Sequence, residues 1–421
     1  MESFTSAQAY LERHFSSGKT YSLERIRSLL SDLKSPHLAV PTIHVGGTAG
    51  KGSTSFLIAS ILEHAGYRVG LYTSPHLISI TERIMIDRTP ITESAFVAIL
   101  ESIKPAIPQG ATYFEIITAM TFAYFAREHV DVAIVEVGVG GKLDCTNVVD
   151  PRVSVITNVG LDHTEILGET IEDISRDKRE IIKPKKPVIS GVTQPQIRDL
   201  IIEKAASVDA PLFLAGRDFH IKNLTIGRPI VFDYVSPEKT LSNLELSLLG
   251  RHQVVNAAVA ITAVFQSGFI VTADAIRKAL STASYPGRME VMGNIIIDGA
   301  HNPMKIQALS NALTDHFPGV QFETLFAVKG DKNAFDMVRT LAPFVSHWYL
   351  TTLEALTDWG KGQMLPVNAL EKTIKEADPG KPVSVVEKPE EFLQNPPPPT
   401  LITGSLYLVG AVEKWISGSR T

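Results

Sequence analysis

The sequence is poor in the features that mark secreted and membrane-spanning proteins. Among its 421 residues only Cys145 is a cysteine, so no intrachain disulfide can form, which favours a reducing cytosol. The segment 1–10 lacks the apolar core of a signal peptide. The most apolar long stretch, 254–271, is too polar for a membrane span, because it includes Asn256, Thr262, Gln266 and Ser267. We therefore expect a cytoplasmic protein without a membrane partner.

The sequence also lacks an excess of positive charge. Its net charge is −5, and lysine and arginine form no convincing cluster, which argues against a nucleic-acid partner. Hydrophobic residues make up 44% of the chain and charged residues 20%, as in globular proteins that bury a large core. At about 100–200 residues per domain, the length predicts two or three domains.

The most informative stretch is 43–53, IHVGGTAGKGS, which joins an apolar strand-like run to an apolar helical pattern. Its glycines allow several N–H groups to turn inward around an anion, and the helix start adds further N–H groups. Lys51 would reach the β- and γ-phosphates of a nucleotide, and the Ser53 hydroxyl would bind Mg²⁺. The loop is shortened, since Val45 stands where the common form has a glycine. The alternative is a glycine-rich turn without a ligand, but the context favours ATP bound by Gly47, Thr48, Gly50, Lys51, Gly52 and Ser53.

Strands and helical patterns alternate along the first two thirds of the chain. Helical patterns cover 54–64 and 116–128, a strand is expected at 67–72, and the β-branched runs at 131–137 and 152–158 are typical of parallel sheets. This is a βαβ arrangement. Shorter strand-like runs between 219 and 249 predict a small β-rich addition.

A domain boundary is expected near 285–287, where helical patterns stop and a Pro-Gly turn begins. Beyond it we expect a helix at 304–314, and the prolines 396–399 form a stiff connector. Strands are expected at 294–298, 324–328, 346–351 and 400–403. The fold class is therefore α/β, with a phosphate-loop domain at 1–285 and a second α/β domain at 289–421.

Polar side chains follow three strands of the first domain, at the edge where ligands bind in open α/β sheets. Glu136 ends one strand before a glycine-rich segment, which favours an Mg²⁺ ligand over a glutamate that caps a turn. His163 follows the next strand, and a lone histidine is more often a structural hydrogen-bonding group than a ligand. Ser74 is either a metal ligand or a helix N-cap.

Asp298 and His301 follow the first strand of the second domain. They fit contact with a nucleotide or substrate in the crevice of an α/β sheet. The alternative is an Asp-Asn-Pro turn that caps a helix.

Nine motifs occur in order along the chain: GTAGKGS, TSPHL, EVGVGGKLDCTN, GLDH, LLGRHQVVNAAVA, PGRMEV, DGAHNP, GDKN and TGSLYLVG. Between Tyr21 and Val412 they resemble the folylpolyglutamate synthase/dihydrofolate synthase family of the Mur-ligase superfamily. The resemblance implies an N-terminal P-loop ATPase domain, a C-terminal Rossmann-like domain and an active site in the cleft between them. It implies an ATP-dependent ligase that joins L-glutamate to a folate, or to dihydropteroate, through an acyl phosphate. Such chemistry needs positive charge around the phosphates and the exclusion of water.

The resemblance also assigns roles to matching residues. One or two Mg²⁺ ions would be surrounded by Ser53, Ser74, Glu136 and His163. Besides the phosphate loop, ATP would be contacted by Asn256, Arg288 and Asp298. The incoming glutamate would lie near His301, Ser405 and Arg83. The catalytic residues would be Lys51, Lys178 and His301.

Lys178 matches the lysine that carries a carbamate in this superfamily. Carbamylation would turn a cation into an oxygen ligand for a second Mg²⁺. On sequence alone, the neighbouring charges in RDKRE also fit a solvated helix lysine paired with an acidic residue.

Four positions depart from the family pattern. Ala49, Lys142 and Asn333 stand where asparagine, arginine and aspartate are common, and the change at Ala49 removes a loop hydrogen bond. Cys145 replaces an alanine beside Asp144, in the segment that helps to form the pterin pocket of bifunctional members. The bulkier thiol would narrow that pocket.

Two other functions compete with a folate ligase. A Mur-type ligase for UDP-linked cell-wall precursors would share the phosphate loop and the lysine, but TSPHL and DGAHNP favour folate. A non-catalytic, ATP-driven switch would not need the second-domain motifs. We expect the protein to be a monomer.

Overall fold

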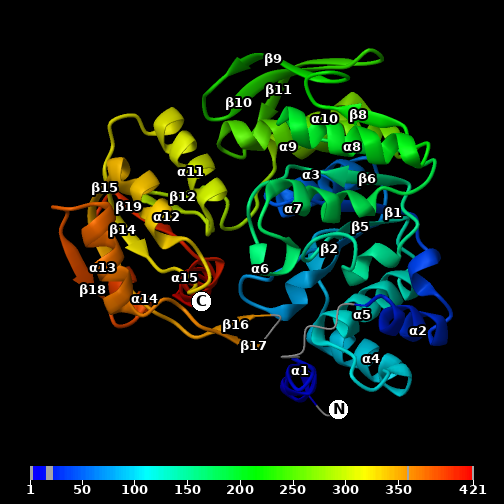
Figure 1. Cartoon of the computed structure of the whole chain (residues 1–421), viewed down its shortest axis with the longest axis horizontal. Helices are drawn as coiled ribbons and strands as arrows, with labels where there is room; N and C mark the ends of the chain where they lie inside the picture. The colour runs from blue at the N-terminus through cyan, green and yellow to red at the C-terminus, as the bar shows by residue number, and fades with distance from the viewer. Residues whose placement is uncertain (1–2, 16–21, 358–359, 420–421) are drawn as a thin grey trace.

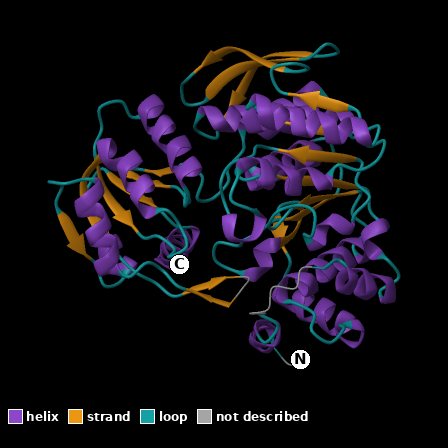
Figure 2. Ribbon diagram, viewed as in Figure 1, coloured by secondary structure: helices purple, strands orange, loops and turns teal. Residues whose placement is uncertain are grey.

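The structure is a computed structural model that describes residues 3–15, 22–357 and 360–419. Two mostly parallel sheets organise these residues, and helices cover both faces of each sheet (Figures 1 and 2). The expected α/β fold class is therefore confirmed. The chain passes to the second sheet shortly before residue 290, and we propose 1–285 and 289–421 as the two domains.

The first sheet has the strand order β4-β3-β2-β5-β1-β6-β7-β8. Six strands run parallel, whereas β3 and β4 form an antiparallel edge. The strands are β1 Thr42–Gly46, β2 Val69–Tyr72, β3 Ile84–Ile86, β4 Thr89–Pro90, β5 Val132–Glu136, β6 Val153–Ile156, β7 Val188–Ser190 and β8 Leu212–Leu214. Every residue of β1, β5 and β6 is buried, so both faces of these central strands are covered, as expected in a parallel sheet.

Helices on the two faces of this sheet bury separate cores. One face carries α3 Lys51–His64, α9 Arg251–Gln266 and α10 Ala273–Ser281. The predicted β-rich addition packs over these helices as an antiparallel sheet of β9 His220–Thr225, β10 Ile230–Val235 and β11 Thr240–Leu246 (Figure 1). The opposite face carries α1 Phe4–Glu12, α2 Glu24–Asp32, α4 Glu93–Ile103, α5 Tyr113–Arg127, α7 Ile171–Lys178 and α8 Pro195–Ser207. The short helix α6, Thr164–Leu167, follows β6.

The second sheet has the order β12-β13-β19-β14-β15-β18, parallel except for the edge strand β12. Its strands are β12 Glu290–Met292, β13 Ile295–Ile297, β14 Phe322–Phe326, β15 Val345–Leu350, β18 Val383–Val385 and β19 Thr400–Thr403. Its helices are α11 Pro303–His316, α12 Ala334–Leu341 and α13 Val367–Ala377 on one face, and α14 Pro389–Leu393 and α15 Leu406–Ser419 on the other. The hairpin of β16 Ala355–Thr357 and β17 Gly360–Gly362 extends toward the first domain (Figure 1).

The helix after the phosphate loop begins earlier than predicted. It starts at Lys51 instead of Thr54, because Gly50 adopts the left-handed conformation (φ 79°) that ends the loop. Lys51 and Ser53 therefore lie in the first turn of α3, where the helix N–H groups are free to bind an anion.

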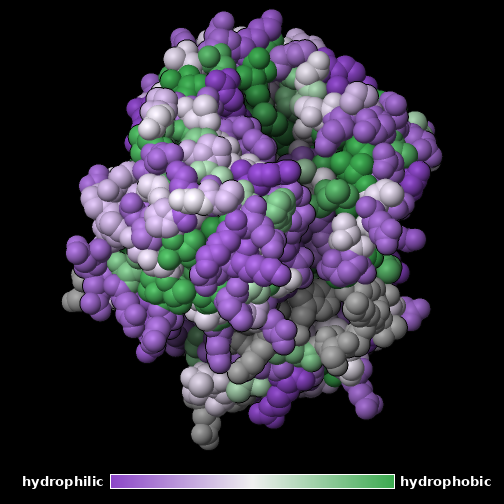
Figure 3. Space-filling view, turned by 60° about the vertical axis from the view of Figure 1, so that its left-hand side comes forward, coloured by the Kyte–Doolittle hydropathy of each residue, from purple (hydrophilic) through white to green (hydrophobic). Residues whose placement is uncertain are grey.

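On the face shown in Figure 3 hydrophilic residues predominate, and hydrophobic residues form small separate groups. Among the described residues, no helix combines the length and the apolar character that a membrane crossing requires.

The core beneath the phosphate loop should limit the stability of the first domain. Leu57 of α3 is fully buried, so Leu57→Ala should destabilise the protein by about 2–5 kcal/mol. The matched control is Ile270→Ala, because Ile270 is 84% exposed and its loss should cost less than about 0.5 kcal/mol. Urea unfolding followed by circular dichroism measures both; equal midpoints for the two variants would contradict this account of the core.

Candidate active site

A cavity of about 380 Å³ lies between the two domains. The first domain lines it with the phosphate loop, the ends of β5 and β6 and the first turns of α9. The second domain contributes the ends of β13, β14 and β19 and the start of α11. Most of the predicted site residues are brought together here: Gly47, Thr48, Gly50, Lys51, Gly52, Ser53, Ser74, Glu136, His163, Lys178, Asn256, Arg288, Asp298, His301 and Ser405.

The phosphate loop is held in shape by the segment that follows β6. Thr48 N–H donates to Asn158 O at 3.0 Å, and Ala49 N–H donates to the Asn158 side-chain oxygen at 2.8 Å. The Thr157 hydroxyl donates to Ala49 O at 2.6 Å. Since Ala49 makes these contacts through its backbone, the loop is ordered without the side chain expected at this position.

The start of α9 supports the loop from the other side. Gln253 donates to Ser53 Oγ at 3.3 Å, and Asn256 donates to Gln253 Oε1 at 3.0 Å. All three side chains are buried. This chain of hydrogen bonds orients the Ser53 hydroxyl and places Asn256 against the loop. Sequence reasoning missed Gln253, although it lies inside one of the nine motifs.

The carboxyl edge of the first sheet places a carboxylate and an imidazole beside the loop. Glu136 is buried and accepts a hydrogen bond from Ser74 N–H at 3.3 Å. Burial raises the pKa of Glu136, and the positive charge of Lys51 offsets only part of this rise. The carboxylate is therefore not fully compensated by the protein. Burial also lowers the pKa of His163 to about 4, which leaves the imidazole neutral at pH 7 with a lone pair available to a ligand.

This edge fits a hard divalent cation in chemistry. Hydroxyl and carboxylate oxygens are preferred by Mg²⁺, and the cavity lining supplies them from Ser53, Ser74 and Glu136. The part of the chain that the structure describes contains no group of three or more His, Cys, Asp and Glu side chains arranged to hold a metal. A magnesium site at this edge would therefore need oxygens from the nucleotide or from water as well.

Lys178 ends α7 with its side chain buried against the cavity. Burial, followed by the field of Lys51, lowers the pKa of Lys178 to about 7. An appreciable fraction of the amine is therefore neutral near pH 7, unlike an exposed lysine. This position does not fit the alternative of a solvated helix lysine.

The second domain holds Asp298 and His301 in fixed orientations. Asp298 is buried and accepts hydrogen bonds at 2.8 Å from Met289 N–H and Ala300 N–H. His301 Nδ1 lies 2.7 Å from Gly299 O, so this nitrogen carries the proton and Nε2 is an acceptor. Burial raises the pKa of Asp298 and lowers that of His301 well below its usual range.

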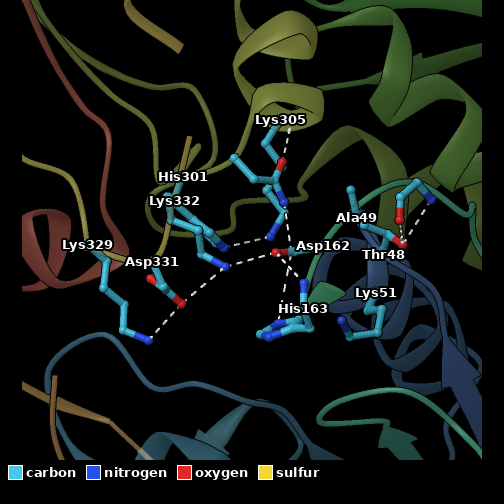
Figure 4. Close-up of polar contacts among 12 residues, drawn as sticks. Thr48, Ala49, Lys51, Asp162, His163, His301, Lys305, Lys329, Asp331 and Lys332 are labelled. Atoms are coloured by element: carbon cyan, nitrogen blue, oxygen red, sulfur yellow. Dashed lines mark hydrogen bonds and ion pairs between the residues drawn. The ribbon is translucent and has the colours of Figure 1, made fainter. Parts of the chain in front are cut away.

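A polar seam around Asp162 joins the two domains at one side of the cavity (Figure 4). Its carboxylate accepts hydrogen bonds at 2.8 Å from Lys332 and from Asn302, both in the second domain. Burial alone would raise the pKa of Asp162, but His163, Lys332 and Lys305 together hold it far below its usual range. Asp162 and Lys332 lie within the GLDH and GDKN motifs, but sequence reasoning did not predict their pairing.

Three predicted residues do not line this cavity. Arg83 is buried in the first domain, where it donates to His76 Nδ1 at 2.9 Å. Asp144 accepts hydrogen bonds from Thr146 and from Val139 N–H. The Cys145 thiol lies 3.3 Å from the Thr118 hydroxyl of α5. An effect of Cys145 on substrate choice would therefore act through the packing of α5 and not through contact with this cavity.

The cavity lining is rich in positive charge. Six cationic side chains face three acidic ones, Glu136, Asp162 and Asp298. The cations are Lys51, Lys178, Arg288, Lys305, Lys329 and Lys332. Such a lining favours ligands with several negative charges. Lys305 and Lys329 also escaped prediction; for Lys305 the available signal was its place one helical turn after His301.

Comparisons with known proteins agree with this geometry. The model of the Mur ligase middle domain matches residues 45–264, and that of the Mur ligase glutamate ligase domain matches residues 287–395. Folylpolyglutamate synthase of Lacticaseibacillus casei is 35% identical over 99% of this chain and 100% of its own length. Dihydrofolate synthase/folylpolyglutamate synthase of Bacillus subtilis is 33% identical over 98% of both chains.

A solved structure gives the same result for the fold. Escherichia coli FolC, in complex with DHPP and ADP, superposes with a TM-score of 0.88 at 30% identity, over 100% of this chain and 99% of that one. The chain therefore belongs to the Mur ligase family and, within it, to the folylpolyglutamate synthase/dihydrofolate synthase family.

Proposed function

We propose that the protein is an ATP-dependent ligase that joins L-glutamate to the carboxylate of a folate, the reaction of a folylpolyglutamate synthase. The observation that carries this proposal is the cationic cavity between the phosphate loop and the DGAHNP segment, in a chain whose relatives are folate ligases. The complex of Escherichia coli FolC with DHPP and ADP supports a nucleotide and a folate-type acid as ligands.

The reaction has two balanced steps. In the first, a carboxylate oxygen of the folate forms a bond to the γ-phosphorus of ATP, and ADP leaves with the electron pair of the broken P–O bond. In the second, the glutamate amine attacks the acyl carbon, a tetrahedral intermediate forms, phosphate leaves and the nitrogen loses a proton. Both steps gain from fixed positive charge, and the acyl phosphate must be protected from water.

The chain supplies groups for each requirement. Lys51 and the loop N–H groups bind the phosphates, while Asn256 and Arg288 contact the nucleotide and Asp298 its ribose. His301 is proposed to lie near the glutamate. Its Nε2 lone pair accepts a hydrogen bond from Lys305 at 2.8 Å, and its pKa, well below the usual range, does not suit it to act as a base. Ser405 lines the same cavity.

Mg²⁺ is the proposed metal cofactor. Ser53, Ser74, Glu136 and His163 would hold one or two ions, and a carbamate on Lys178 would add an oxygen ligand. When bound, the metal would neutralise part of the charge on the phosphates. The carbamate proposal is supported by the buried place of Lys178 at the cavity.

A second activity, the addition of glutamate to dihydropteroate, is proposed for the same site. The Bacillus subtilis relative carries the names of both activities, and both reactions join a carboxylate to the same amine. Asp144 and Cys145 belong to the segment that would favour one acid over the other. We propose a cytoplasmic monomer, with Arg83 acting on glutamate through its neighbours.

The first prediction of the proposed function concerns substrates. Incubation with ATP, Mg²⁺, L-glutamate and tetrahydrofolate should give a product heavier by one glutamate residue, measured by mass spectrometry. Parallel incubations contain dihydropteroate or a UDP-MurNAc peptide as the acid. A product from the UDP-MurNAc peptide alone would establish a Mur-type ligase, and ATP hydrolysis independent of any acid would favour the nucleotide switch.

The second prediction concerns Lys51. Lys51→Ala should abolish turnover, because the γ-phosphate loses the cation that the phosphate loop holds through the hydrogen bond from Lys51 Nζ to Gly47 O. The helix α3, which begins at Lys51, should stay folded. The assay is folate-dependent phosphate release, with thermal unfolding as the folding control. Retention of more than about a tenth of the wild-type rate, or about 1.4 kcal/mol, would rule out this role.

The third prediction concerns Lys178. Lys178→Ala should lose activity and regain part of it when formate or acetate is added, because the small acid can replace the carbamate oxygen. Lys186→Ala is the matched control, since Lys186 lies near the surface, paired with Asp150, and should not respond to the acid. An intact mass that shows unmodified Lys178 in active enzyme would defeat the carbamate.

A further inference from the structure

Lys305 is a cation of the cavity that has no place in the roles assigned so far. It lies in the first turn of α11, and its ammonium group lies 2.8 Å from His301 Nε2. Because His301 carries its proton on Nδ1, it accepts this hydrogen bond without adding a negative charge. Among the described residues, Lys305 has no other side-chain partner.

The other lysines on this wall are paired with carboxylates. Lys332 lies 2.8 Å from Asp162, and Lys329 lies 3.2 Å from Asp331. Lys305, in contrast, faces the cavity without an ion-pair partner among the described residues, and only the more distant charge of Asp162 favours its protonated form. A half-buried ammonium group without an ion-pair partner is suited to bind an anion in the cavity.

A series of contacts places Lys305 next to the phosphate loop. The Thr48 hydroxyl of the loop donates to Gly160 O at 3.1 Å. Gly160 is in turn pressed against Met304, because a Cβ at residue 160 would lie 1.6 Å from the Met304 terminal methyl group. Lys305 follows Met304 directly. The start of α11 therefore packs against Gly160, where the absence of a side chain leaves room for Met304.

Lys305 and Lys51 both line the cavity, and Figure 4 draws Asp162 between them. Among the charged groups, Lys51 lowers the pKa of Lys305 the most. Both lysines also lower the pKa of the Glu136 carboxyl group at the edge of the first sheet. Lys51 comes from the first domain and Lys305 from the second. Because Lys51 belongs to the phosphate loop, the anion that both lysines could contact is the terminal phosphoryl group of a bound ATP.

We propose that Lys305 is a catalytic residue that contacts the phosphoryl group transferred from ATP, on the side opposite Lys51. This assignment deepens the proposed function and depends on ATP as the phosphoryl donor. As the oxygen of the acid bonds to phosphorus and ADP departs with its electron pair, Lys305 transfers no proton. Its charge stabilises the non-bridging oxygens while the group moves between its two partners.

A binding experiment tests this contact without turnover. Lys305→Met keeps the length of the side chain and removes the charge. Its affinity for the β,γ-methylene analogue of ATP should fall by about ten- to a hundredfold, while its affinity for ADP, which lacks the γ-phosphoryl group, stays within about twofold. Isothermal titration calorimetry measures both, and thermal unfolding checks the fold.

A kinetic experiment distinguishes the phosphoryl group from the glutamate carboxylates. Lys305→Met should lower kcat by about a hundredfold at saturating glutamate, with little change in the KM for glutamate. Lys305→Arg should recover part of the rate, because arginine keeps the charge in another geometry. The control is Lys375→Met, since Lys375 is exposed and paired with Glu371 far from the cavity.

Three results would overturn the assignment. Equal losses of affinity for ADP and for the analogue would show that Lys305 does not distinguish the γ-phosphoryl group. Unchanged affinity for both would show that it does not contact the nucleotide. A raised KM for glutamate with an unchanged kcat would place a glutamate carboxylate at Lys305. If the wild-type protein binds the analogue but joins no glutamate to a folate, the proposed function fails while the contact stands.

Discussion

The junction between the loop after β6 and the start of α11 is the contact on which the site depends. On one side Gly160 accepts a hydrogen bond from the Thr48 hydroxyl of the phosphate loop and donates its N–H to the same oxygen. On the other side Gly160 contacts Met304. Two residues later, Asp162 binds Lys332 and Asn302 of the second domain. A single loop therefore orders the ATP-binding backbone and sets how closely the second domain approaches it. Because the paired carboxylate is largely buried, loss of its partners would cost about 3–5 kcal/mol.

The loop can take this role because it sits at the carboxyl edge of a parallel sheet. β1, β5 and β6 are neighbours in the order of the sheet, so the residues that follow them meet at one edge although they are distant in sequence. The β-rich addition packs over α9 and α10, on another side of the domain, and does not line the cavity (Figure 1).

Local sequence patterns predicted where individual site residues lie, but not the contacts that these residues make with distant parts of the chain. The glycine spacing and the strand ends were sufficient to place Lys51, Ser53, Glu136 and His163 at one edge, because these rules depend on neighbours in the chain. Gln253, Asp162 and Lys305 were not singled out. Their roles arise from contacts with Ser53, Lys332 and His301 or from the approach of the other domain, and single-sequence patterns carry no record of such pairs. The start of α3 was also misplaced, because the left-handed Gly50 decides it.

The excess of positive charge links function to stability. Burial, followed by the field of Lys51, lowers the pKa of both Lys178 and Lys305 to about 7, from about 10.5 for a free lysine. Between about pH 7 and 10.5 the unfolded chain therefore binds more protons than the folded one, so these residues make the fold more stable as pH rises through that range. Near neutral pH they oppose folding when the cavity contains no anion. An anion bound in the cavity would offset this cost, because a ligand that binds only the folded chain stabilises it.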